Sequence, residues 1–76
     1  MTRQEIYNRI MKMLEIEQNH LRNRYETGEI SCGNYIELSS NRTEEYKEYV
    51  KELALTSDDE LEDKMSFVIN ANLETF

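Results

Sequence analysis

The sequence predicts an all-α fold in which a long antiparallel helical hairpin is followed by a shorter third helix. Apolar residues recur at helical spacing on both sides of the chain's middle. The chain has no proline, and its only two glycines, Gly28 and Gly33, lie between the two apolar patterns. A chain of 76 residues has room for one domain, so we expect residues 1–76 to fold as a single helical unit.

The first helix is expected over residues 2–27. Thr2 and Glu5 match the T-x-x-E capping box, in which each side chain accepts a hydrogen bond from the other residue's backbone N–H. No proline or glycine interrupts the residues that follow. The apolar residues of one face follow steps of three, four or seven, and they are Tyr7, Ile10, Leu14, Leu21 and Tyr25.

A turn is expected at residues 28–31. Gly28 stands where the first helix ends, because glycine enters the left-handed conformation without steric cost. Ile30 offers an apolar contact back to that helix, and Ser31 can cap the next one by accepting a hydrogen bond from a free backbone N–H. Two helices joined by so short a turn run antiparallel.

The second helix is expected over residues 32–55. Its polar stretch at residues 39–43 has a low helix propensity, because serine, threonine and asparagine side chains compete for backbone hydrogen bonds. Whether the helix is bent or broken near residue 40 therefore stays open. The apolar face of this helix carries Tyr35, Leu38, Tyr46, Tyr49 and Leu53.

The third helix is expected over residues 58–70. Ser57 and Glu60 match a second capping box, and the two aspartates between them favour the positive end of a helix dipole. In the tail at residues 71–76, Leu73 and Phe76 are apolar and have little else to fold with. The inward-facing residues of the helix are Leu61, Met65 and Val68.

The net charge of −7 is concentrated in residues 44–63. This segment holds nine acidic residues against Lys47 and Lys51, and acids and bases balance in the rest of the chain. A surface that binds nucleic acid directly needs clustered Lys and Arg side chains. The charge distribution therefore argues against direct nucleic-acid binding and favours a partner with a basic surface.

Around the predicted turn, the sequence reads G-x-[IL]-[ST] between apolar helix residues. In this respect the span 21–38 resembles the short helical hairpin family called SHOCT. The chain departs from that family at residues 32–34, which replace the usual acidic residues, and in its longer second helix. The resemblance implies a packing and oligomerisation element without catalytic residues. The matching residues are Leu21, Tyr25, Gly28, Ile30, Ser31 and Tyr35.

The chain lacks the groups from which a catalytic site is built, and we expect no enzyme activity and no cofactor. A nucleophile needs an adjacent base that is itself held in orientation, and the chain has one histidine, His20, and one thiol, Cys32. We interpret both as structural or solvated residues. No glycine-rich phosphate loop or His-x-x-x-His pair is present. The carboxylates of residues 58–63 lack the interior glycine of a calcium loop, so no metal site is expected.

The composition favours a cytoplasmic protein, which for a phage-encoded chain means the cytoplasm of the host. The single cysteine excludes an internal disulfide and fits a reducing compartment. Because the first residues are polar and charged, we expect no signal peptide. No apolar run approaches the roughly 18 residues that a membrane helix needs.

The leading hypothesis is a small non-enzymatic protein that inhibits or modulates a partner. Its acidic segment imitates the charge of nucleic acid and occupies a basic surface on a nucleic-acid-handling protein or nuclease. Small acidic inhibitors of phages and mobile elements, such as anti-CRISPR proteins and DNA mimics, are similar in size and charge. The predicted partner-binding residues are Glu44, Glu45, Glu48, Tyr49, Glu52, Asp58, Asp59, Glu62 and Asp63.

Two other functions stay open. A structural or oligomerisation module would form a homodimer, because the apolar faces of the two long helices exceed what a short third helix covers. A small DNA-binding regulator would use four basic side chains of the first helix, Arg3, Arg9, Arg22 and Arg24. The predicted self-association residues are Tyr7, Ile10, Leu14 and Leu21.

Overall fold

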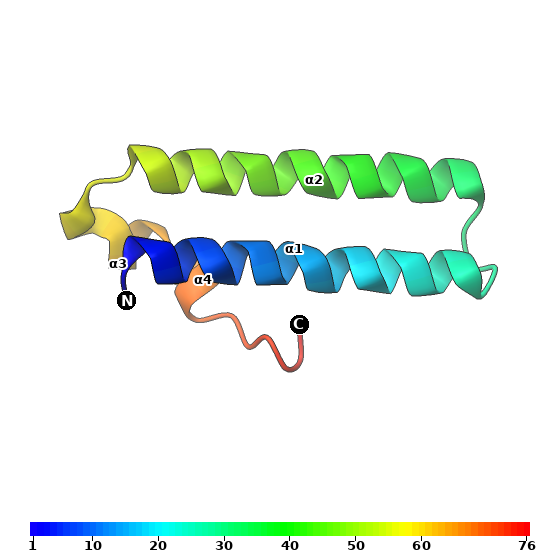
Figure 1. Cartoon of the computed structure of the whole chain (residues 1–76), viewed down its shortest axis with the longest axis horizontal. Helices are drawn as coiled ribbons and strands as arrows, with labels where there is room; N and C mark the ends of the chain where they lie inside the picture. The colour runs from blue at the N-terminus through cyan, green and yellow to red at the C-terminus, as the bar shows by residue number, and fades with distance from the viewer.

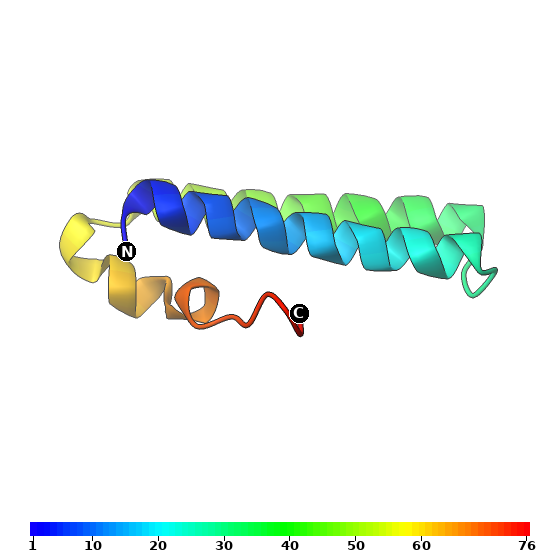
Figure 2. The ribbon, with the colours of Figure 1, turned by 60° about the horizontal axis from the view of Figure 1, so that its bottom comes forward.

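The computed structural model describes residues 1–76, and all of its regular elements are helices, as the sequence predicts (Figure 1). The elements are α1 (Arg3–Glu26), α2 (Cys32–Leu55), the short 3₁₀ helix η1 (Asp58–Glu60), α3 (Leu61–Lys64) and α4 (Ser66–Ile69). Helices α1 and α2 form a long antiparallel hairpin. The shorter helices and the C-terminal segment lie against one face of its open end (Figure 2).

The predicted capping box at the start of α1 is confirmed. The Glu5 backbone N–H donates to Thr2 Oγ1 at 3.1 Å, and the Thr2 backbone N–H donates to Glu5 Oε1 at 3.0 Å. The second of these bonds favours the charged carboxylate, so it lowers the pKa of Glu5. The helix therefore starts where the sequence indicates.

The turn also follows the predicted chemistry. Gly28 has φ 81°, the left-handed conformation that glycine adopts most easily. The Glu29 backbone N–H reaches back to the carbonyl of Arg24 at 2.8 Å, which closes the end of α1. Ser31 Oγ accepts a hydrogen bond from the Asn34 backbone N–H at 3.1 Å and so caps α2.

Helix α2 runs without a break through residues 39–43. Two residues of this stretch, Ser39 and Thr43, bond across the hairpin to Gln18 of α1. Gln18 Nε2 donates to the carbonyl of Ser39 and to Thr43 Oγ1, both at 3.1 Å, and Ser39 Oγ donates to Gln18 Oε1 at 2.9 Å. These tertiary bonds use the side chains that would otherwise compete with the helix.

The prediction of one helix over residues 58–70 is wrong. Ser57 makes no side-chain cap, and the chain forms η1, α3 and α4 in place of a continuous helix. The interruption lies at Met65, which has φ −105° and ψ 18° and is completely buried. Leu61, Met65 and Val68 still enter the core together, as their helical spacing predicts, on both sides of the interruption.

The tail also differs from the expectation of a segment with little to fold against. Leu73 and Phe76 are partly buried and pack against the core. That core lies between the open end of the hairpin and the short helices (Figure 2). Its buried residues are Ile6, Ile10, Met13, Tyr46, Leu53, Leu61, Met65 and Val68.

Two arginines of α1 fasten the C-terminal third of the chain. The Arg3 guanidinium donates to the carbonyl of Leu53, to the carbonyl of Thr56 at 2.9 Å and to Asp58 Oδ1 at 2.6 Å. Arg9 donates to the carbonyl of Val68 at 3.0 Å and to that of Ala71. The carbonyls of Leu53 and Val68 also accept backbone N–H groups, whereas those of Thr56 and Ala71 have no backbone donor. Each arginine therefore satisfies one carbonyl that the backbone leaves free.

We expect Arg3→Ala to lower the free energy of unfolding by about 2 kcal/mol, because it leaves two partly buried carbonyls and one carboxylate without their charged donor. Urea denaturation followed by circular dichroism measures this. Arg22→Ala is the control, since Arg22 is exposed and forms no ion pair. Equal stability of the two variants would contradict the role given to Arg3.

Replacing each of the two glycines with alanine is expected to change the stability of the protein in opposite directions. Gly28→Ala should destabilise the protein by about 1–2 kcal/mol, because alanine is strained at φ 81°. Gly33 lies in the first turn of α2, and a methyl group there would meet no other atom within 4 Å. Gly33→Ala should therefore be neutral or stabilising by about 0.5 kcal/mol. Thermal melts of both variants check the sign of each change.

Candidate functional site

The nine acidic residues of segment 44–63 divide into paired and unpaired groups. Glu44 pairs with Lys47 at 3.3 Å, and Asp58 pairs with Arg3 at 2.6 Å. Glu45, Glu60 and Glu62 also have a cationic partner within 4 Å. The carboxylates without such a partner are Glu48, Glu52, Asp59 and Asp63.

A shallow hollow forms where the end of α2 meets η1 and α3. It brings together three of the predicted partner-binding residues, Glu48, Tyr49 and Glu52, and adds Glu60 from η1. Leu55 also lines it, as do Lys51, Thr56 and Lys64. The hollow thus brings residues of α2 beside one residue of η1 and one of α3. The other predicted partner-binding residues do not line it, and they are Glu44, Glu45, Asp58, Asp59, Glu62 and Asp63.

Two exposed apolar side chains lie at this end of the molecule, and the sequence analysis missed both. Leu55 is 78% exposed, the largest value among the big apolar residues, and Phe67 is 43% exposed. The Phe67 ring meets Tyr49 edge to face, with ring centroids 5.0 Å apart. The helical spacing of α2 could have identified Leu55, because this apolar residue does not fall on the apolar face of the helix and is therefore expected to be exposed.

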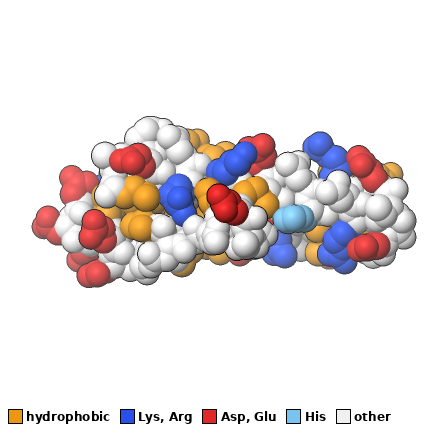
Figure 3. Space-filling model, turned by 90° about the horizontal axis from the view of Figure 1, so that it is seen from below, with side chains coloured by type: hydrophobic (Ala, Val, Ile, Leu, Met, Phe, Trp, Pro, Cys, Tyr) orange, Lys and Arg blue, Asp and Glu red, His pale blue; other side chains and the backbone are white.

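We call the carboxylates of residues 48–63, together with Tyr49, Leu55 and Phe67, the acidic end. In the view of Figure 3, carboxylates gather at the end of the molecule that holds η1 and α3. Lys and Arg side chains on the same face lie mainly toward the middle and the hairpin turn. The charge asymmetry that the sequence shows along the chain thus becomes an asymmetry along the long axis of the fold.

Hydrogen bonds and burial fix the tyrosines beside the acidic end. Tyr49 donates its hydroxyl to Glu45 Oε1 at 2.7 Å, and this bond, with burial and the Glu45 charge, raises the pKa of Tyr49 to about 12. Burial raises the pKa of Tyr46 as well, and the nearby Glu17 carboxylate adds to the effect. One Glu17 oxygen is buried without a hydrogen-bond donor, 3.5 Å from Arg42 Nε.

The predicted self-association residues do not share one surface. Tyr7 is 39% exposed and Leu14 is partly buried. Ile10 and Leu21 are buried inside the chain's own fold, so the folded chain has no surface at these positions to offer a second copy. Tyr7 and Leu14 instead border a groove on the hairpin face opposite α4.

The four arginines that a DNA-binding surface would use are mostly engaged within the chain. Arg3 and Arg9 hold backbone carbonyls, and Arg24 pairs with Glu29 at 3.2 Å. Arg22 alone has no partner. The basic footprint of α1 is therefore small.

The chain's single histidine, His20, and its single cysteine, Cys32, are both exposed. The Cys32 thiol lies beside Tyr25, whose pKa is raised chiefly by a hydrogen bond with the thiol. No group of three or more His, Cys, Asp or Glu side chains is placed to hold a metal ion. The helices long enough to span a bilayer are too polar to do so.

Comparison with protein-family models, curated proteins and solved structures finds no match to this chain.

Replacing Glu45 with glutamine should lower the pKa of Tyr49 from about 12 toward its ordinary value of 10.0, because the nearby negative charge disappears. Because folding raises this pKa, the contribution to stability is full below about pH 10 and is lost as the pH rises toward 12. Glu45→Gln should therefore flatten the loss of stability in this window. NMR titration of labelled tyrosine measures the pKa. Glu44→Gln, which leaves the Tyr49 bond intact, should change neither quantity.

Proposed function

We propose that this chain is a non-enzymatic binding protein whose acidic end binds a basic surface of a partner protein. The observation that carries the proposal is the set of four carboxylates without a cation within 4 Å, at the same end as the 78% exposed Leu55. Unpaired carboxylates keep their charge available to a partner. An exposed leucine beside them offers apolar surface to bury.

The contacts of the hollow support a protein partner. Glu48 and Glu52 are one helical turn apart on α2, so they present two charges to the same partner surface. Leu55 lies at the last position of that helix, and Tyr49 and Phe67 add aromatic area. Apolar anchors surrounded by charged residues are typical of protein interfaces, in which the charges set the association rate and the anchors set the lifetime.

The chemistry of the acidic end suits a groove that normally holds nucleic acid. Such a groove is lined with Lys and Arg side chains that contact phosphates. Carboxylates on a rigid helix compete for the same side chains, so binding would inhibit or modulate a nucleic-acid-handling protein. A direct DNA-binding role has weaker support, because Arg22 is the one arginine of α1's four without an internal partner.

The test is a tagged pull-down from host lysate with the double variant Glu48→Lys and Glu52→Lys. We expect the wild type to retain a basic, nucleic-acid-binding protein, with at least about tenfold loss of the captured protein in the variant. Raising the salt from about 50 to about 300 mM should release the captured protein, because screening weakens charge attraction. Added double-stranded DNA should release it as well.

The matched control is Glu26→Lys with Glu37→Lys, which makes the same change in net charge at the hairpin-turn end. Both glutamates are exposed and form no ion pair. Capture that falls equally in the two double variants would show a general charge effect and contradict a specific site. If the amount of captured protein changes neither with salt nor in either double variant, the acidic end is not the binding surface.

A further inference from the structure

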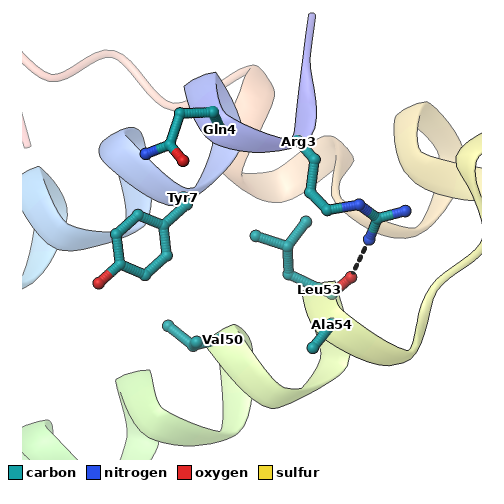
Figure 4. Close-up of a pocket in the computed structure, with 6 residues that line it drawn as sticks. All are labelled: Arg3, Gln4, Tyr7, Val50, Leu53 and Ala54. Carbon is teal, nitrogen blue, oxygen red and sulfur yellow. Dashed lines mark hydrogen bonds between the residues drawn. The ribbon is translucent and has the colours of Figure 1, made fainter.

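A second surface lies on the opposite side of the hairpin from α4. Two adjoining hollows run between α1 and α2 and share Tyr7 and Val50. Figure 4 shows Tyr7 of α1 facing Val50 of α2, with Leu53 and Ala54 further along α2 in the lining of the first hollow. Together they form one groove, which we call the hairpin groove, and its apolar lining continues to Met11 and Leu14.

The hairpin groove has a different chemistry from the rest of this acidic chain. No Asp or Glu side chain lines either hollow, although the chain contains 16 acidic residues. The charged groups at its borders are Arg3 and Lys47, and each is already paired with a carboxylate of its own chain. Tyr7 and Met11 are 39% and 40% exposed there. The groove is thus an apolar, nearly neutral strip.

The fold leaves this side without a covering layer. The molecule measures 45 × 23 × 16 Å, and its short helices cover the other face of the hairpin (Figures 1 and 2). Each long helix has 24 residues and is about 36 Å long and about 10 Å wide, so the two side by side present a face of about 700 Å². A stable dimer buries about 600–1,000 Å² on each partner. The uncovered face is therefore large enough for one.

We propose that the hairpin groove is the interface on which a second copy of this chain packs. Two chains of net charge −7 repel each other wherever their carboxylates come close. The groove has no carboxylates, so two copies can bring their apolar groove residues into contact there. A basic partner finds no carboxylate there to pair with. A strongly acidic partner would be repelled by the rest of the chain.

The proposed dimer joins two hairpins face to face as a four-helix arrangement. Tyr7, Met11 and Val50 of each copy are then covered by the other. The interface retains Tyr7 and Leu14 from the sequence-based prediction and replaces the buried Ile10 and Leu21 with Met11, Val50 and Ala54. It is separate from the acidic end, since the hollow of Glu48, Glu52 and Leu55 shares no lining residue with either part of the groove.

Analytical ultracentrifugation of the full chain tests the proposal at protein concentrations from about 10 to about 500 μM. We expect the wild type to reach twice the mass of one chain. Met11→Glu and Ala54→Glu should each weaken dimerisation at least about tenfold, because they place charges in the apolar interface. Both positions are exposed and glutamate is a good helix former, so the monomer keeps its helix content, which circular dichroism checks.

Leu55→Glu is the matched control, since it adds the same charge at an exposed apolar position outside the groove and should leave the dimer intact. Salt should strengthen the dimer, because it screens the repulsion between like-charged chains. This is the reverse of the effect expected for a basic partner on the acidic end. A failed dimer test therefore does not count against that partner, and a failed pull-down does not count against the dimer.

Either of two results would overturn the proposal. One is a wild type that remains monomeric up to about 500 μM, which would leave the groove to a different protein. The other is a dimer that neither Met11→Glu nor Ala54→Glu weakens, which would place the contact on another surface.

Discussion

The C-terminal carbonyls of α2 impose the constraint on which the fold depends. A helix end leaves its last carbonyls without internal donors, and a chain this small has few ways to supply them. Arg3, in the first turn of α1, donates to the carbonyls of Leu53 and Thr56 and to Asp58. The same guanidinium therefore joins the two ends of the hairpin and sets the direction in which the chain continues. Arg9 repeats the arrangement further along, at Val68 and Ala71.

That constraint explains why the two faces of the hairpin differ. Once Arg3 and Arg9 hold the C-terminal third against one side of α1, Met65 and Val68 enter the core on that side. The opposite side receives no covering element and keeps Tyr7 and Met11 exposed. Arg3 and Arg9, which the sequence suggested as residues of a DNA-binding surface, thus help to determine which apolar residues are buried and which stay exposed.

The contacts of Arg3 and Arg9 also concentrate negative charge at one end of the molecule. Because η1 and α3 are held beside the end of α2, carboxylates from two segments meet at one end of an elongated molecule (Figure 3). Of the arginines of α1, Arg3 pairs with Asp58 at this end, Arg9 donates to carbonyls, and Arg24 pairs with Glu29 at the hairpin turn. The chain therefore has a charged end that favours basic surfaces and an apolar groove without acidic residues. Their different chemistries allow both to be occupied at once, so a dimer would carry two acidic ends.

Local signals in the sequence determined the hairpin. Thr2 with Glu5, Gly28 and Ser31 act through neighbouring backbone groups, so the start of α1, the turn and the start of α2 follow from a few residues each. The all-α class and the acidic segment were also evident. The tertiary structure alone decided the course of residues 57–76, where Ser57 makes no side-chain cap and the helix is interrupted at the buried Met65. It also decided which carboxylates lack a cationic partner. Tyr7 and Ile10 belong to the same apolar stripe of α1 in the sequence, yet Ile10 is buried and Tyr7 is exposed, because only Ile10 is covered by the rest of the fold.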